Sequence, residues 1–145
     1  MTALVAPPEP PATRGRRMLA PTATIGGLAL ATLALHLRDP HQQGSWGFCP
    51  FNALTGLYCP GCGGLRAVND LTDGQVGAAL SSNIVVTLGV PITVVALVLW
   101  AADRWTGRTR TVEWRTWQRY TVVLGVVLTI FTIVRNLPFG AWLAP

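Results

Sequence analysis

The sequence predicts an all-α membrane protein with three transmembrane helices and a short interfacial helix in a cysteine-containing outer loop. Half of the 145 residues are apolar and only 12% are charged, which is about half the charged share of an ordinary soluble domain. The apolar residues gather in three long segments that are nearly free of formal charge. Arginines gather beside those segments, as basic residues do in proteins that span a membrane.

The three apolar segments are long enough to cross a bilayer as helices. A bilayer core of about 30 Å requires about 20 helical residues at about 1.5 Å each. Residues 18–37 and 84–102 carry no formal charge when His36 is neutral. The third segment, residues 120–137, qualifies when Arg135 lies at its end, where a long side chain can reach the interface. We therefore expect membrane spans at these three positions.

The placement of arginines predicts the orientation of the spans. Basic residues outnumber acidic ones in the tail 1–17 and in the loop 103–119, whereas the loop 38–83 has two arginines against three aspartates. Because positive charge favours the cytoplasmic side, we expect the tail and the loop 103–119 in the cytoplasm and the loop 38–83 outside. The protein would then be a multi-pass protein of the bacterial plasma (inner) membrane. The proline-rich tail is expected to be disordered, and residues 18–145 are expected to form the membrane domain.

The net charge of +5 does not indicate nucleic-acid binding. All eleven basic residues are arginines, and aromatic side chains are interleaved with those of the loop 103–119 and its flank. Arginines and aromatic rings beside apolar segments are typical of contacts with lipid headgroups at a membrane interface. We expect the lipid bilayer as the surroundings, another membrane protein or a second copy of the chain as a partner, and no nucleic acid.

The chemistry of the chain is concentrated in its three cysteines, which all lie in the loop 38–83. Cys49 precedes a Cys59-Pro60-Gly61-Cys62 motif, and a CxxC motif is typical of a redox pair or of half a metal site. A closed zinc site needs a fourth ligand, for which His41 is a candidate. Four alternatives remain open: a structural disulfide, a structural metal, a redox pair, or a metal-handling site for zinc or copper.

A short helix is expected directly after the cysteines, over residues 63–71, where apolar residues recur on one side. Arg66 and Asp70 stand four residues apart and can pair on its surface. Ser82 or Asn83 is placed to cap the second span, because its side chain can accept an otherwise unpaired backbone N–H.

Several polar side chains are expected near the cysteine loop, at the outer edge of the spans. They can hold a ligand, or they can pair with one another and reach the interface. These polar residues are Arg66, Asp70, Asn83, Arg135 and Asn136.

The ordered motifs resemble a family of small bacterial, mainly actinobacterial, membrane proteins of unknown function. The resemblance rests on Cys49-Pro50-Phe51, Thr55-Gly56-Leu57, Cys59-Pro60-Gly61-Cys62-Gly63 with Arg66-Ala67, Gly74, Asn83, and Arg135-Asn136-Leu137-Pro138. It extends over residues 44–145 and implies an integral membrane protein with no established activity. Leu65 and Ile84 depart from the family pattern, which more often has threonine and proline there.

Three functions follow from these observations as alternatives. The first is a non-enzymatic scaffold or partner-binding subunit in which the cysteine cluster is structural. The second is a membrane thiol-disulfide oxidoreductase with Cys59 as the exposed nucleophile and Cys62 shielded on the following helix. The third is a metal-binding or metal-handling protein.

Overall fold

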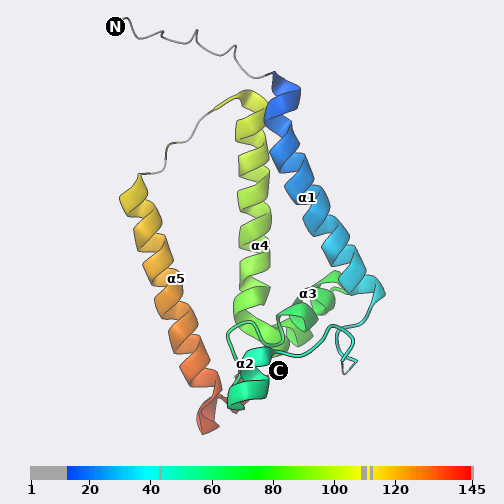
Figure 1. Cartoon of the computed structure of the whole chain (residues 1–145), viewed down its shortest axis with the longest axis vertical. Helices are drawn as coiled ribbons and strands as arrows, with labels where there is room; N and C mark the ends of the chain where they lie inside the picture. The colour runs from blue at the N-terminus through cyan, green and yellow to red at the C-terminus, as the bar shows by residue number, and fades with distance from the viewer. Residues whose placement is uncertain (1–12, 43, 109–110, 112, 145) are drawn as a thin grey trace, which may run out of the picture.

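The structure is a computed structural model that describes residues 13–42, 44–108, 111 and 113–144. These residues form helices and connecting segments, with no strand among them (Figure 1). The elements in chain order are α1 (Arg14–Leu37), α2 (Pro50–Thr55), α3 (Gly64–Thr72), α4 (Val76–Thr106), α5 (Trp114–Arg135) and the 3-10 helix η1 (Pro138–Leu143). The predicted all-α class and the short helix after the cysteines are confirmed.

Within the described part of the chain, α1, α4 and α5 are the three helices long and apolar enough to cross a membrane. α1 and α4 contain the first two apolar segments identified in the sequence, and α5 contains the third as far as Arg135. The protein therefore fits a multi-pass membrane protein. The helices differ in length from the expected spans. α1 already begins at Arg14, inside the tail that was expected to be disordered, and residues 1–12 of that tail lie outside the described residues. α4 extends beyond residues 84–102 at both ends.

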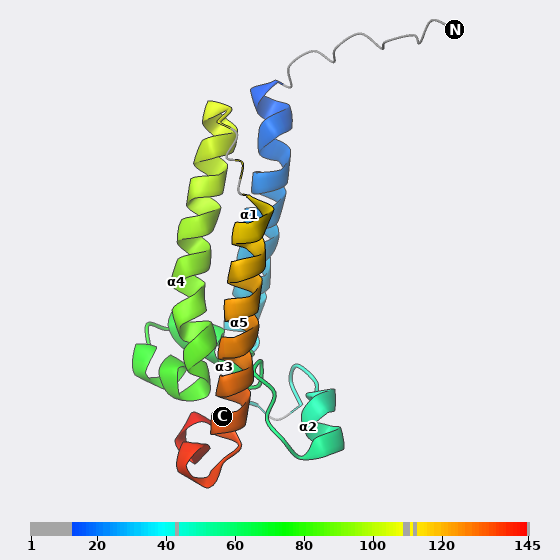
Figure 2. The same cartoon turned by 90° about the vertical axis from the view of Figure 1, so that its left-hand side faces the viewer.

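The two ends of the helix group differ in what they carry. The cysteine loop, α3 and η1 lie at one end, whereas the start of α1, the end of α4 and the start of α5 lie at the other (Figures 1 and 2). α3 packs against α4 and α1, and α1 packs against α4. α5 joins this group at the cysteine end through η1, which contacts both α4 and α5. In Figure 1, α5 diverges from α4 with distance from this end.

Most of the buried side chains lie at the cysteine end, and about half of them are polar. The long helices expose most of their large apolar side chains, as expected for surfaces that face lipid rather than water. The buried polar side chains are Asn69, Asp70, Ser82, Asn83, Thr87 and Arg135. Because buried polar groups need hydrogen-bond partners, these residues mark the part of the fold that depends most on specific hydrogen bonds.

α4 is interrupted at Asn83, where the backbone is extended (φ −166°, ψ 102°). Asn83 Oδ1 accepts a hydrogen bond from Val86 N at 3.0 Å, which is the cap predicted for the second span. Ser82, the other capping candidate, donates to Asp70 instead. Thr87 Oγ1 lies 2.7 Å from Ala79 O and 2.8 Å from Asn83 O, so its one hydroxyl hydrogen can be donated to either carbonyl beside the break. The break turns the start of α4 toward α3.

Candidate thiol site

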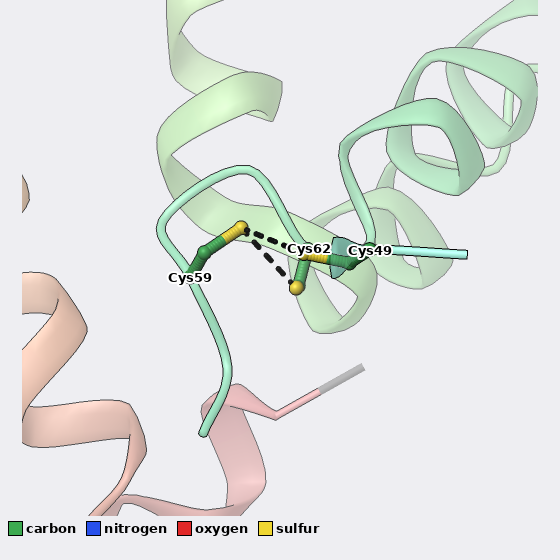
Figure 3. A group of neighbouring side chains, drawn as sticks. All are labelled: Cys49, Cys59 and Cys62. Atoms are coloured by element: carbon green, nitrogen blue, oxygen red, sulfur yellow. Dashed lines mark hydrogen bonds between the residues drawn. The ribbon is translucent and has the colours of Figure 1, made fainter. Parts of the chain in front are cut away.

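The three cysteine side chains converge although Cys49 is separated from the CxxC motif by α2. Their Sγ atoms all lie within 4.8 Å of one another. The Cys49 thiol donates to Cys59 Sγ at 3.6 Å, and Cys59 Sγ lies 3.3 Å from Cys62 Sγ. Figure 3 shows Cys59 pointing toward the other two sulfur atoms. All three are half-buried free thiols.

Local backbone geometry places each thiol. Cys49 is the N-cap of α2, and Cys59 and Cys62 form a turn in which Cys62 N donates to Cys59 O at 3.1 Å. Gly63 then adopts a left-handed conformation (φ 77°) at the start of α3, which glycine adopts without a steric penalty. A Cβ on Gly64 would lie 3.3 Å from Val86 Cγ2. The Cys59–Gly64 segment therefore reverses direction close against α4.

The thiols of Cys49 and Cys62 differ in acidity. The backbone N–H of Asn52, in the first turn of α2, donates to the Cys49 sulfur and lowers the pKa of Cys49, against the opposing effect of burial. Burial, followed by the hydrogen bond with Cys59, raises the pKa of Cys62 to about 12. Cys49 therefore forms a thiolate at lower pH than Cys62, which holds its proton. Of these two cysteines, the one with the more acidic thiol is therefore Cys49, which lies outside the CxxC motif.

Arg135 lies buried beneath the CxxC turn and binds its backbone. Its side chain is 1% exposed. Nη1 donates to Cys59 O at 2.9 Å, and Nη2 donates to Cys62 O at 3.2 Å and Leu143 O at 3.0 Å. The guanidinium carbon lies 4.8 Å from the centroid of the Phe131 ring. Arg135 was expected to reach the membrane interface, but it is enclosed within the protein, where it binds the backbone of the CxxC turn.

Two asparagines bind the same segment from α4 and from the end of α5. Asn83 Nδ2 donates to Pro60 O at 2.9 Å and to Cys62 O at 3.0 Å. Asn136 pairs with Tyr58, accepting from its N–H at 2.8 Å and donating to its C=O at 2.9 Å. The polar side chains of two long helices therefore hold the thiol turn by its backbone and leave the sulfur atoms accessible to a ligand.

Asp70 and His41 belong to a neighbouring network. Asp70 is buried, accepts from Ser82 Oγ at 2.8 Å and lies 2.8 Å from His41 Nε2. His41 is therefore paired with Asp70, and the group of potential metal ligands found in the described residues comprises the cysteines alone. Arg66 does not pair with Asp70 as expected, because Ser82 and His41 occupy that carboxylate. Arg66 Nε instead donates to Pro40 O at 3.5 Å.

The polar residues expected near the loop are thus divided between separate environments. Arg135, Asn83 and Asn136 bind the thiol turn, whereas Asp70 joins the histidine network and Arg66 stands apart from both. Sequence reasoning missed the acceptors, since most are backbone carbonyls. The sequence offered one signal for these carbonyl acceptors, namely the polar residues Arg135, Asn83 and Asn136. A buried arginine or asparagine at a helix end needs hydrogen-bond partners.

The donor set is suited to a metal ion that prefers sulfur. Thiolates bind zinc and copper(I) well, and tetrahedral Zn–S bonds of about 2.3 Å place two sulfur atoms about 3.8 Å apart. The distances of 3.6 and 3.3 Å from Cys59 Sγ to the other two sulfur atoms are close to that spacing. Cys49, Cys59 and Cys62 can therefore supply three corners of a tetrahedron.

Comparison with known protein families gives a match over part of the chain. Residues 49–97 match the family model of a protein of unknown function, DUF2752. The match contains all three cysteines, Asn83 and most of α4, but it ends before α5 and therefore excludes Arg135 and Asn136. It is shorter than the resemblance expected over residues 44–145. Searches among curated proteins and among solved structures found no match.

Proposed function

We propose that the protein is a membrane scaffold or partner-binding subunit. A metal ion bound to Cys49, Cys59 and Cys62 would hold together its cysteine cap, which is the segment 49–64 with α2 and the CxxC turn. The observation that carries this proposal is the convergence of the three Sγ atoms within 4.8 Å. Three thiols from two separate turns meet at one point, and thiolates brought together without a cation would repel one another. A bound cation removes that repulsion.

The metal ion would have a structural role in this cap. Cys59 and Cys62 are already fixed to α4 and α5 through Asn83 and Arg135. Cys49 is fixed to neither helix by a hydrogen bond from these side chains, so a metal ion would join α2 to the rest of the cap. Structural zinc sites stabilise folded domains in this way because the unfolded chain does not preform the site.

The proposal includes an orientation in the bacterial inner membrane. The end opposite the cysteines carries the arginines of α1 together with Arg104 and Arg108, and Arg14 stacks over Trp105 there with 4.9 Å between guanidinium carbon and ring centroid. Positive charge favours the cytoplasmic side. The cysteine cap would then lie outside the cytoplasm. Labelling the cysteines in intact cells with a membrane-impermeant thiol reagent tests this orientation.

Metal analysis of the full-length protein, purified in detergent, tests the function. We expect about one equivalent of zinc or copper per chain, as for a single site. The metal should be lost from the Cys49→Ser, Cys59→Ser and Cys62→Ser variants. His41→Ala serves as the control, because His41 pairs with Asp70, and it should keep the metal. A metal content that is zero, or that survives all three cysteine substitutions, contradicts the proposal.

Thiol-disulfide exchange is the second candidate function, and the unequal acidity of Cys49 and Cys62 favours it. Attack by the Cys49 thiolate on a partner's disulfide would form a mixed disulfide and release one partner thiolate. Attack by Cys59 on Cys49 would release the second partner thiolate and leave a Cys49–Cys59 disulfide. The partner disulfide would be reduced and the two cysteines oxidised. Trapping of a mixed disulfide in a Cys59→Ser variant, but not in a Cys49→Ser variant, would support this function.

A further inference from the structure

A cavity of about 630 Å³ opens beside the thiols. This volume is within the range of about 300–1,000 Å³ found for small-molecule sites. Two of the three cysteines line the cavity together with aromatic and basic side chains. The lining residues that bear on its chemistry are Trp46, Phe48, Cys49, Tyr58, Cys62 and Arg66.

Arg66 is the cation of this cavity, and no described carboxylate pairs with it. The three aspartates of the surrounding loop are engaged elsewhere. Asp39 accepts from the backbone N–H of His41, Asp70 from Ser82, and Asp73 lies 3.2 Å from His36 Nδ1. The interaction of Arg66 with Pro40 O is long, at 3.5 Å. Its guanidinium therefore retains donors for an anion.

We propose that the cavity binds a small carboxylate, which pairs with Arg66 and supplies the fourth ligand of the metal ion on the thiols. This inference rests on the proposed metal site. Three protein ligands and one exchangeable position are the arrangement of zinc sites that accept an external ligand. Because Cys49, Cys62 and Arg66 line one cavity, a ligand bound there can approach two of the three thiols and the guanidinium.

Charge favours a carboxylate over a doubly charged phosphate. Three thiolates and a divalent ion leave one negative charge, and Arg135, bound to the carbonyls of Cys59 and Cys62, offsets it. Arg66 adds one positive charge at the cavity. A single carboxylate neutralises this charge, and its two oxygens match the donor geometry of a guanidinium. A dianion would leave a net negative charge in a half-buried site.

The aromatic side chains indicate what the rest of the ligand is like. Phe48 is 81% exposed and Trp46 is 40% exposed on the cavity side of the loop. Binding sites for small organic molecules combine such apolar walls with a few polar groups that fix orientation. The site is therefore suited to a carboxylate attached to a short carbon chain.

Cobalt can report on the site, because thiolate-bound Co²⁺ has charge-transfer absorption and ligand-field bands that respond to its other ligands. The full-length protein in detergent is loaded with Co²⁺ and titrated with butyrate, a short-chain monocarboxylate, with inorganic phosphate as the comparison. We expect butyrate to change the ligand-field bands. Arg66→Gln should retain the charge-transfer band and bind butyrate about tenfold or more weakly, because a charged hydrogen bond is lost. Arg104→Gln, at the other end of α4, should behave as the wild type.

The outcomes separate the two proposals. Absence of the thiolate-to-cobalt band overturns the metal site, and the carboxylate inference with it. A normal band that butyrate leaves unchanged, an equal response in Arg66→Gln, or an equal response to phosphate overturns the carboxylate inference alone. Arg66→Lys is a second variant should Arg66→Gln fail to fold. It keeps the charge without the fork of donors, so it should bind cobalt normally and butyrate more weakly than the wild type.

Discussion

Asn136 and Tyr58, which are 78 positions apart in the sequence, pair through two hydrogen bonds. Tyr58 N donates to Asn136 Oδ1 at 2.8 Å, and Asn136 Nδ2 donates to Tyr58 O at 2.9 Å. The side-chain amide of Asn136 thus pairs with both the N–H and the C=O of Tyr58, the residue directly before Cys59. This pairing connects the end of α5 to the thiol turn without using the thiols.

Asn136→Ala is expected to destabilise the protein by about 1–3 kcal/mol, because it leaves two partly buried backbone groups of Tyr58 without partners. Thermal unfolding in detergent measures this change. Gln118→Ala, on the exposed first turns of α5, is the matched control and should change stability by less than about 0.5 kcal/mol. Equal effects of the two substitutions would mean that the Tyr58 pairing does not stabilise the fold.

Arg135→Met is expected to destabilise the cap by about 3 kcal/mol, because charged hydrogen bonds to buried carbonyls are lost. It should also weaken metal binding, since the compensating positive charge beside the thiolates is removed. Arg135→Lys keeps the charge but cannot reproduce the several contacts of the guanidinium. The lysine variant should therefore retain more metal affinity than the methionine variant, at a similar loss of stability. A lysine variant with no better metal affinity than methionine would contradict the role of charge.

The fold class was predictable because its determinants are local. Three long apolar segments and their flanking arginines are visible in the sequence alone, and each segment lies wholly or almost wholly within one of α1, α4 and α5. The cap at Asn83 was predictable for the same reason, since its acceptor role involves Val86, three residues away. The break in α4 was not, because it depends on Asn83 also binding Pro60 and Cys62 across the fold.

The site was predictable in its thiols and less so in its surroundings. Because all three cysteines lie near one another in a single loop of the sequence, their proximity in the fold was to be expected. The partner of Asp70 was mistaken, because the helical spacing to Arg66 suggested a local pair, whereas Ser82 and His41 reach the same carboxylate from distant segments. Arg135 was expected at an interface. Its burial depends on η1 turning back so that Leu143 O accepts from it, which no local pattern indicates.

Asp70 and Ser82 should be coupled energetically. Asp70→Ala leaves the buried Ser82 hydroxyl unpaired and is expected to destabilise the protein by about 1–3 kcal/mol. In a double-mutant cycle with Ser82→Ala, the coupling energy should be at least about 0.5 kcal/mol. Unfolding midpoints of the two single variants and the double variant give this value. Additive effects would show that the 2.8 Å contact between the two side chains contributes little.

The raised pKa of Cys62 makes the metal-free protein sensitive to alkali. Burial holds this pKa at about 12 in the folded state, against an ordinary value of 9.0. Between these two values the folded chain binds more protons at Cys62 than the unfolded chain, so stability must fall as pH rises through this window. Below about pH 9 this contribution is fully present.

Thermal unfolding of the metal-free protein from about pH 8 to pH 11 measures the fall. Cys62→Ser lacks the thiol and should show a shallower decline, with Cys59→Ser as the comparison that retains it. Metal binding should show the opposite trend, because the ion displaces the Cys62 proton and its apparent affinity therefore rises with pH, by up to about tenfold per unit for that proton. A stability profile in Cys62→Ser as steep as in the wild type would place the alkaline sensitivity in another group. A pH-independent metal affinity would show that Cys62 is not a ligand, or that it binds without losing its proton.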